Sequence, residues 1–136
     1  MRLILDTNVL VSALIQRSYP YYLLDRVLAD PELQLCLSEP LLAEYTEVLN
    51  RPKFSRFPDF QARAHALLAD LQGRALSFAP TKQLHVIADA PDNRLLELAA
   101  ASQADYLVTG NTSDFTMLAF RGTRIVSPRE FFELLR

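Results

Sequence analysis

The stretch LILDTNVLVSALI, residues 3–15, places one carboxylate between two apolar segments. Residues 2–5 form a short apolar run that predicts a β-strand, and residues 7–15 have the length and composition of a helix. Asp6 lies at their junction. A polar residue where an apolar strand passes into a helix is the first candidate for a functional position.

The same alternation of strands and helices continues along the chain. Further strands are predicted at 33–37, 84–88, 105–110 and 123–127, and further helices at 20–30, 38–50, 60–76, 91–103 and 128–136. Ser38 is the expected cap of its helix, because a hydroxyl there is followed by a proline in the first turn. The alternation predicts an α/β sandwich with a mostly parallel sheet, whose strands are buried on both faces.

Composition limits the class of protein. The chain has 136 residues, half of them hydrophobic, which suits a single domain over residues 1–136. Fourteen basic and sixteen acidic residues give a net charge of −2, so nucleic acid would have to bind a local basic patch. The single cysteine fits a reducing compartment, and no apolar run has the length of a signal peptide or a membrane span. We expect a soluble, cytoplasmic protein with no membrane association.

Several acids follow predicted strands. Asp6 ends the first strand, Asp89 and Asp92 come after the strand at 84–88, and Asp114 comes after the strand at 105–110. Ligand sites of parallel sheets gather at the carboxyl ends of the strands. These side chains are therefore expected at one edge of the sheet.

Glu44 reaches the same edge by a different route. It lies within the helix at 38–50, on the border of the apolar stripe that contains Leu41 and Val48. A side chain at that border can turn inward over the sheet edge, whereas Glu47 points further into solvent. Glu44 is therefore the fourth candidate acid.

Each acid also has a structural interpretation. Asp89 is explained as a helix cap that accepts from the amide of Asp92, and Asp92 as a first-turn acid favoured by the helix dipole. Asp114 could cap a short helical turn at 115–120. It is the joint placement of the acids that favours a functional site.

A cluster of carboxylates predicts a divalent cation. Carboxylates held together repel one another, and a bound cation removes that repulsion. Oxygen ligands without His or Cys favour Mg²⁺ or Mn²⁺. Such an ion activates water and stabilises charge on a phosphate oxygen, which is the chemistry of phosphodiester hydrolysis.

Four segments carry a family resemblance. They are LILDTNVLVSAL at the start, LSEPLLAEYTEVLNRPKF in the middle, DAPDNRLLELAAASQADYLVTGNTSDF further on, and IVSPREFFELL near the end. Together they resemble the PIN-domain ribonucleases, in particular the small stand-alone toxins of bacterial toxin-antitoxin pairs.

The resemblance implies a fold, an activity and partners. The implied fold is a three-layer α/β/α sandwich with a central, mostly parallel five-stranded sheet. The implied activity is that of a Mg²⁺- or Mn²⁺-dependent endoribonuclease, with an RNA substrate, an antitoxin protein as partner and a homodimeric state. The residues that match the catalytic and metal-binding acids of the family are Asp6, Glu44, Asp92 and Asp114.

Three further residues match supporting positions of the family. Asn8 corresponds to a polar residue that orients the first acid, and Thr109 to a hydroxyl that lines the site. Asn111 stands where many members have Asp; other members have Asn there and an acid three residues later, as Asp114 is here.

The loop at 51–63 interleaves cations with phenylalanines, and two interpretations are open. Arg51, Lys53 and Arg56 could contact an RNA backbone while the aromatic rings stack on bases. Alternatively, this is a solvated loop whose aromatic rings pack into the core. A second aromatic group, Tyr19, Tyr21 and Tyr22, is a candidate for a dimer or antitoxin interface.

Two other functions compete with the ribonuclease. Asn111 keeps open a catalytically weakened PIN fold that binds RNA or protein without cleaving it. A phosphatase that uses Asp6 as nucleophile is a weaker alternative, because the second Asp expected two positions later is replaced by Asn8.

Overall fold

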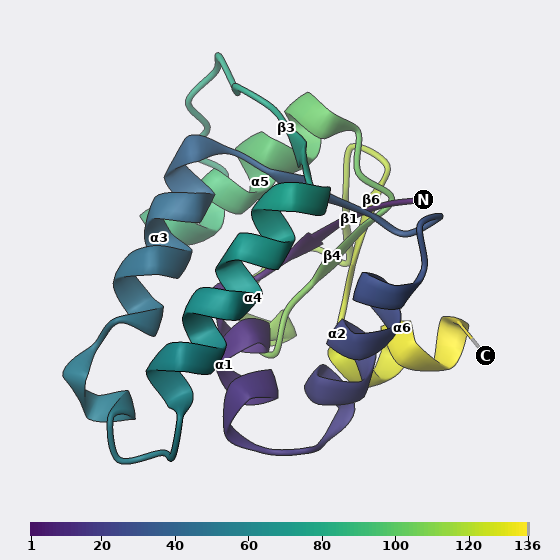
Figure 1. Cartoon of the computed structure of the whole chain (residues 1–136). Coiled ribbons are helices and arrows are strands. Elements are labelled where there is room, and N and C mark those ends of the chain that lie inside the picture. The colour runs from purple at the N-terminus through teal and green to yellow at the C-terminus, as the bar shows by residue number, and fades with distance from the viewer. Residues whose placement is uncertain (136) are drawn as a thin grey trace.

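The computed structural model describes residues 1–135, and Figure 1 shows their arrangement. The strands are β1 (Arg2–Leu5), β2 (Gln34–Leu37), β3 (Leu76–Ser77), β4 (Tyr106–Val108), β5 (Ala119–Phe120) and β6 (Thr123–Val126). The helices are α1 (Thr7–Ile15), α2 (Tyr19–Ala29), α3 (Glu39–Leu49), α4 (Phe60–Arg74), α5 (Ala90–Ser102) and α6 (Pro128–Leu134), with short 3₁₀ turns η1 (Pro52–Phe54) and η2 (Thr112–Asp114). Among these residues no helix has the length and apolar content needed to cross a membrane.

The sheet confirms the predicted α/β class. Its strand order is β3-β2-β1-β4-β6-β5, and every neighbouring pair is parallel except β5 with β6. It has six strands rather than the five expected, because two short edge strands are present and one predicted strand is not. The sheet is therefore mostly parallel.

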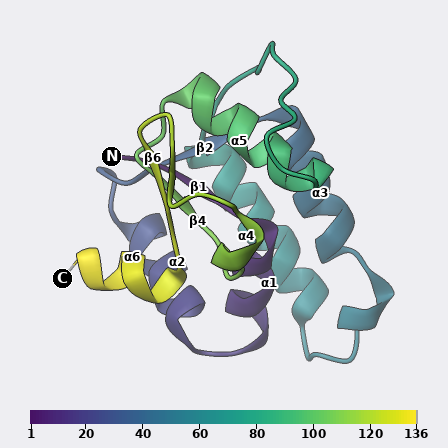
Figure 2. The same ribbon diagram turned by 180° about the vertical axis from the view of Figure 1, so that it is seen from behind.

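Helices cover both faces of the sheet. α1, α2 and α4 lie on one face, and Figure 2, seen from behind, shows α5 on the other. The central strands are accordingly apolar throughout: Leu3, Ile4, Leu5, Leu107 and Val108 are buried from both sides. Ser38 caps α3 as expected, since its hydroxyl accepts from the amide of Leu41.

The strand predicted at 84–88 is wrong. Its backbone amides bond to side chains of α5 instead of to a neighbouring strand: Leu84 donates to Glu97, and Val86 and Ile87 donate to Asn93. Because these amides are already satisfied, the segment lies on α5 as an irregular loop. Asp89 and Asp92 consequently follow a loop and not a strand.

The two edge strands were not predicted. The helix expected to reach residue 76 ends at Arg74, and Leu76–Ser77 pair with Cys36–Leu37 as β3. β5 pairs with β6 through a tight hairpin whose central residues, Arg121 and Gly122, have φ of 48° and 87°. Positive φ at both positions matches the right-handed twist of a two-residue hairpin.

The path of the chain creates a switch point beside β1. It moves outward from β1 through β2 to β3 and then returns by way of α5 to β4, on the other side of β1. Ligands of open α/β sheets bind outside the carboxyl ends of the strands at such a reversal. Asp6 follows β1 and Thr109 follows β4, so both lie at this point.

Candidate active site

Asp6 is held in place by both β1 and β4. Its amide donates to the carbonyl of Val108 over 2.9 Å, which continues the ladder between the two strands. The Thr109 hydroxyl donates to Asp6 Oδ2 over 2.8 Å, and Asn8 Nδ2 lies 3.4 Å from the same oxygen. Thr109 and Asn8, two of the three residues expected to support the site, thus orient the carboxylate of Asp6.

The segment after β4 closes around Asn8. Asn8 Oδ1 accepts from the amide of Gly110 over 2.9 Å, and a Cβ at position 110 would lie only 3.3 Å from that oxygen. The amide of Asn111 donates to Thr109 Oγ1 over 3.1 Å. The small residue at 110 therefore allows the close approach of this segment to the end of β1.

The helix that carries Glu44 is tied to the junction of β1 and α1 through two hydroxyl groups. The Thr7 hydroxyl donates to Glu44 Oε2, and the buried Tyr45 hydroxyl donates to the carbonyl of Leu5. Both bonds join α3 to the residues that flank Asp6. Glu44 is half-buried, as expected for a residue on the border of the apolar stripe.

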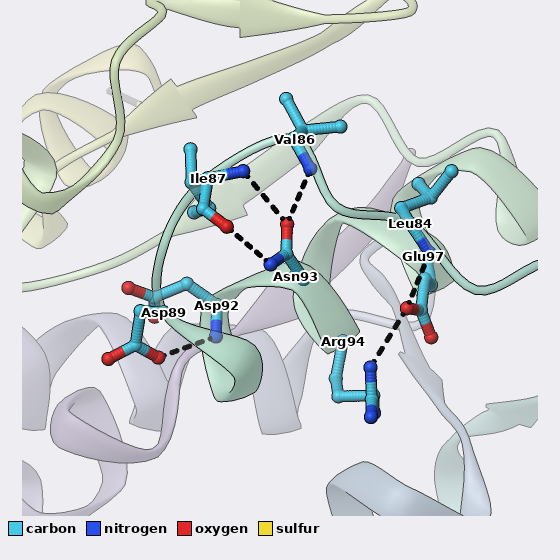
Figure 3. Close-up of polar contacts among 8 residues, drawn as sticks. All are labelled: Leu84, Val86, Ile87, Asp89, Asp92, Asn93, Arg94 and Glu97. Carbon is cyan, nitrogen blue, oxygen red and sulfur yellow. Dashed lines mark hydrogen bonds and ion pairs between the residues drawn. The ribbon is translucent and has the colours of Figure 1, made fainter.

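Asp92 reaches the site from the first turn of α5. Its amide donates to Asp89 Oδ1 over 3.1 Å, so the predicted role of Asp89 as the helix cap is confirmed. Figure 3 shows this cap beside the contacts of Asn93 with the preceding loop. Asp92 is half-buried, whereas Asp89 is exposed.

Asp114 is the last residue of η2 and is exposed. No helical turn follows it in residues 115–118, so its alternative interpretation as a cap of that turn is wrong. Asn111 precedes η2 and is also exposed, with no side-chain capping bond. Both side chains are free to face a ligand.

The acids influence one another electrostatically. Burial, followed by the charges of Asp89, Asp6, Asp114 and Glu44, raises the pKa of Asp92 to about 7. Burial also raises the pKa of Asp6, against the Thr109 hydrogen bond, and the charge of Glu44 adds to the increase. The site therefore concentrates negative charge.

Asp6, Glu44, Asp92 and Asp114 form no ion pair with a basic side chain within the described residues. The ion pairs formed there join other acids, namely Asp30, Glu47, Asp70, Glu97 and Glu133, to arginines. In residues 1–135 no three Asp, Glu, His or Cys side chains stand close enough to hold a metal ion as they are placed. The set of oxygen donors nevertheless suits a hard divalent cation, because that cation would offset the burial and the neighbouring negative charges that together raise the pKa of Asp92.

The loop at 51–63, here called the cationic loop, connects α3 to the start of α4 and projects at the tip of this helical hairpin (Figure 1). Phe54 and Phe60 are buried and stacked with centroids 4.8 Å apart, so the interpretation that these rings stack on RNA bases is wrong. Lys53 and Arg56 are exposed, each beside a phenylalanine ring. Arg51 pairs with Glu47 over 2.8 Å.

Three residues with specific hydrogen bonds around the acids were not predicted from the sequence. Thr7 lies inside the Asp-Thr-Asn motif, and its position next to Asp6 in the sequence could have indicated a role at the site. Tyr45 lies in sequence on the apolar stripe of its helix, and this pattern does not indicate the specific bond that its hydroxyl forms. Asn93 lies on the buried face of α5, where an amide side chain is expected to have hydrogen-bond partners.

The comparison with protein families decides the class of this site. A family model described as PIN domain matches residues 2–113. The chain belongs to the PIN domain family. PIN domains are generally nucleases, which agrees with an acidic edge at the switch point of the sheet.

A solved structure supports the fold of this PIN domain. A chain of VapBC2 from Rickettsia felis, in a crystal structure bound to a DNA fragment from their promoter, has a TM-score of 0.60 and 18% sequence identity. The match covers 93% of this chain and 98% of that chain. At this identity the likeness concerns the fold. A comparison with curated proteins found no match.

Proposed function

We propose that this PIN domain is a metal-dependent endoribonuclease that hydrolyses RNA phosphodiester bonds. The observation that carries the proposal is the electrostatic coupling of Asp92 to Asp6, Asp114 and Glu44, four acids from separate segments of the chain that form no ion pair within the described residues. Mutual repulsion of this kind is relieved by a divalent cation.

In this proposal the four acids hold Mg²⁺ or Mn²⁺. The ion, when bound, supplies an activated water and stabilises charge on a phosphate oxygen. Thr109 and Asn8 orient the Asp6 carboxylate through their bonds to Oδ2. Asp114 serves as the fourth acid, and Asn111 offers a neutral oxygen at the start of the same 3₁₀ turn.

RNA cleavage in the presence of Mn²⁺ tests this activity. The wild-type chain and Asp25→Asn, an exposed acid on α2, should both cut RNA, whereas Asp6→Asn should not. Both substitutions remove one carboxylate, so they are matched in charge. Cleavage that persists in Asp6→Asn would show that the activity belongs to another protein.

We propose the exposed cations Lys53 and Arg56, together with Arg51, as contacts for the RNA backbone. The charge of Glu44 contributes to the raised pKa of Arg51, behind the larger effect of its bond to Glu47. Arg51 directly follows the cap of α3, so the cationic loop begins at the end of the helix that carries Glu44.

We further propose that this nuclease is the toxin of a cytoplasmic toxin-antitoxin pair and forms a homodimer. The fold shared with a chain of the VapBC2 structure supports an antitoxin partner. Exposed apolar side chains on α2 and α6, Tyr19, Tyr22 and Leu134, offer a surface for burial against a protein. Light scattering of the purified chain, alone and with the product of a neighbouring gene, tests both assemblies: a monomer that binds no such product contradicts them.

The neutral residue at 111 supports one alternative, a PIN domain that binds RNA without cleaving it. In that case Asn111→Asp should create cleavage that the wild-type chain lacks. In the nuclease account the wild-type chain already cleaves, and Asp114→Asn abolishes or strongly reduces that cleavage.

A further inference from the structure

The loop at 84–89 is bound to α5 by the side chain of Asn93 (Figure 3). Asn93 Oδ1 accepts from the amides of Val86 and Ile87, each over 3.0 Å, and its Nδ2 donates to the carbonyl of Ile87 over 2.6 Å. The residue is only 3% exposed. One buried amide thus fixes the backbone of two consecutive residues.

Two further hydrogen bonds join Asp89, at the end of this loop, to the first turn of α5. Asp89 Oδ1 accepts from the amide of Asp92 over 3.1 Å, and the carbonyl of Asp89 accepts from the amide of Asn93 over 3.1 Å. Residues 86–89 are therefore held by hydrogen bonds against the first turn of α5, which begins at Ala90. Asp92 lies between the two anchoring residues, Asp89 and Asn93.

We infer that Asn93 is a positioning residue, which sets the direction of the Asp92 carboxylate by clamping the loop at 86–89 to the first turn of α5. The inference rests on the proposed function, in which Asp92 binds a divalent cation. Groups that orient a metal ligand through hydrogen bonds control affinity without touching the ion. Without the Asn93 side chain, the loop would no longer be fixed to α5, and Asp89, which lies in that loop, would no longer be held in place as the helix cap.

Glu97 provides a matched control on the same helix. Its Oε2 accepts from the amide of Leu84 over 2.9 Å and from Arg94 Nη1 over 3.0 Å, and it is nearly as buried as Asn93. It therefore anchors the same loop, further from the acids. Glu97→Ala and Asn93→Ala both remove a buried polar anchor, but only Asn93→Ala releases the part that carries the cap of Asp92.

Two measurements on the full chain test the inference. Mn²⁺ titration followed by electron paramagnetic resonance should show affinity weakened by about tenfold or more in Asn93→Ala and close to wild type in Glu97→Ala. Amide hydrogen exchange without metal should be faster at Asp92 in Asn93→Ala than in Glu97→Ala. Equal Mn²⁺ affinities in the two variants, or equal exchange at Asp92, would overturn the role of Asn93.

A second variant attacks the clamp from the other side. Val86→Pro removes one of the two amides that donate to Asn93 and leaves α5 intact, so it serves if Asn93→Ala does not fold. It should also speed exchange at Asp92, and unchanged exchange would contradict the clamp. Failure of the wild-type chain to bind Mn²⁺ would instead contradict the proposed metal-dependent function, and the exchange measurement would still decide the role of Asn93.

Discussion

The Thr109 hydroxyl donates to Asp6 Oδ2 over 2.8 Å and so joins the ends of β4 and β1 at the switch point of the sheet. Burial raises the pKa of Asp6, and the hydrogen bond from Thr109 opposes that increase. It therefore favours the charged carboxylate that a cation requires.

Thr109→Val should destabilise the protein by about 1–3 kcal/mol at neutral pH, because it removes a hydrogen bond to a half-buried carboxylate and an acceptor for the amide of Asn111. The loss should shrink in acid, where Asp6 is protonated. Urea unfolding at several pH values measures it. Thr123→Val is the control, since its buried hydroxyl donates to the carbonyl of Ala104 far from any acid of the site. An equal pH dependence in both variants would count against the Thr109–Asp6 bond.

Tyr45→Phe should cost about 1 kcal/mol of unfolding free energy, because the buried hydroxyl donates to the carbonyl of Leu5. The same loss should loosen α3 next to Glu44 and reduce RNA cleavage. Tyr22→Phe removes a hydroxyl that is exposed on α2 and should change neither quantity. Identical urea midpoints for the two variants would show that the Tyr45 bond contributes nothing.

Asp92 should make the metal-free protein less stable as pH rises. Its pKa is about 7 in the folded protein against a usual 3.8, so the folded state holds the proton more tightly than the unfolded state. Its contribution therefore favours folding more at low pH and decreases as pH rises from 3.8 through about 7, then stays constant.

Thermal unfolding in a chelator across that pH range checks this prediction. Subtracting the Asp92→Asn curve from the wild-type curve isolates the contribution of the carboxyl group. A difference that is flat, or that favours wild type at higher pH, would contradict the raised pKa.

The cationic loop should contribute salt-dependent affinity for RNA. Replacing both Lys53 and Arg56 with Gln should reduce the slope of log affinity against log salt by about 1.4, if each contacts one phosphate of a single strand. Arg26→Gln, at an exposed cation on α2, is the control that shows the effect of losing one positive charge away from the loop. An unchanged slope, measured with an RNA whose cleavage is prevented by chelator, would place the RNA elsewhere.

Local patterns were sufficient to predict the elements that carry most of the site. Residues 2–5 and 7–15 form β1 and α1 with the predicted bounds, because an apolar run ends at Asp6 and a helix-forming segment follows. Glu44 lies half-buried on its helix, as its place beside the apolar stripe implies. These features depend on residues close together in the sequence.

Features that depend on distant partners were not predictable. The apolar composition of residues 84–88 favours a strand, but Asn93 and Glu97 satisfy their amides from a helix. The two-residue strands β3 and β5 are too short to show any periodicity. The cap formed by Asp89 was predicted correctly, since a cap requires only the next turn of the same helix.

The most direct test of the acidic edge as a metal site is an anomalous difference map from a crystal of this chain soaked in Mn²⁺. The account predicts an ion bound by oxygens of Asp6 and Asp92, with Glu44 and Asp114 in contact directly or through water. An ion bound only elsewhere, or an edge that stays empty at Mn²⁺ concentrations that support RNA cleavage, would contradict it.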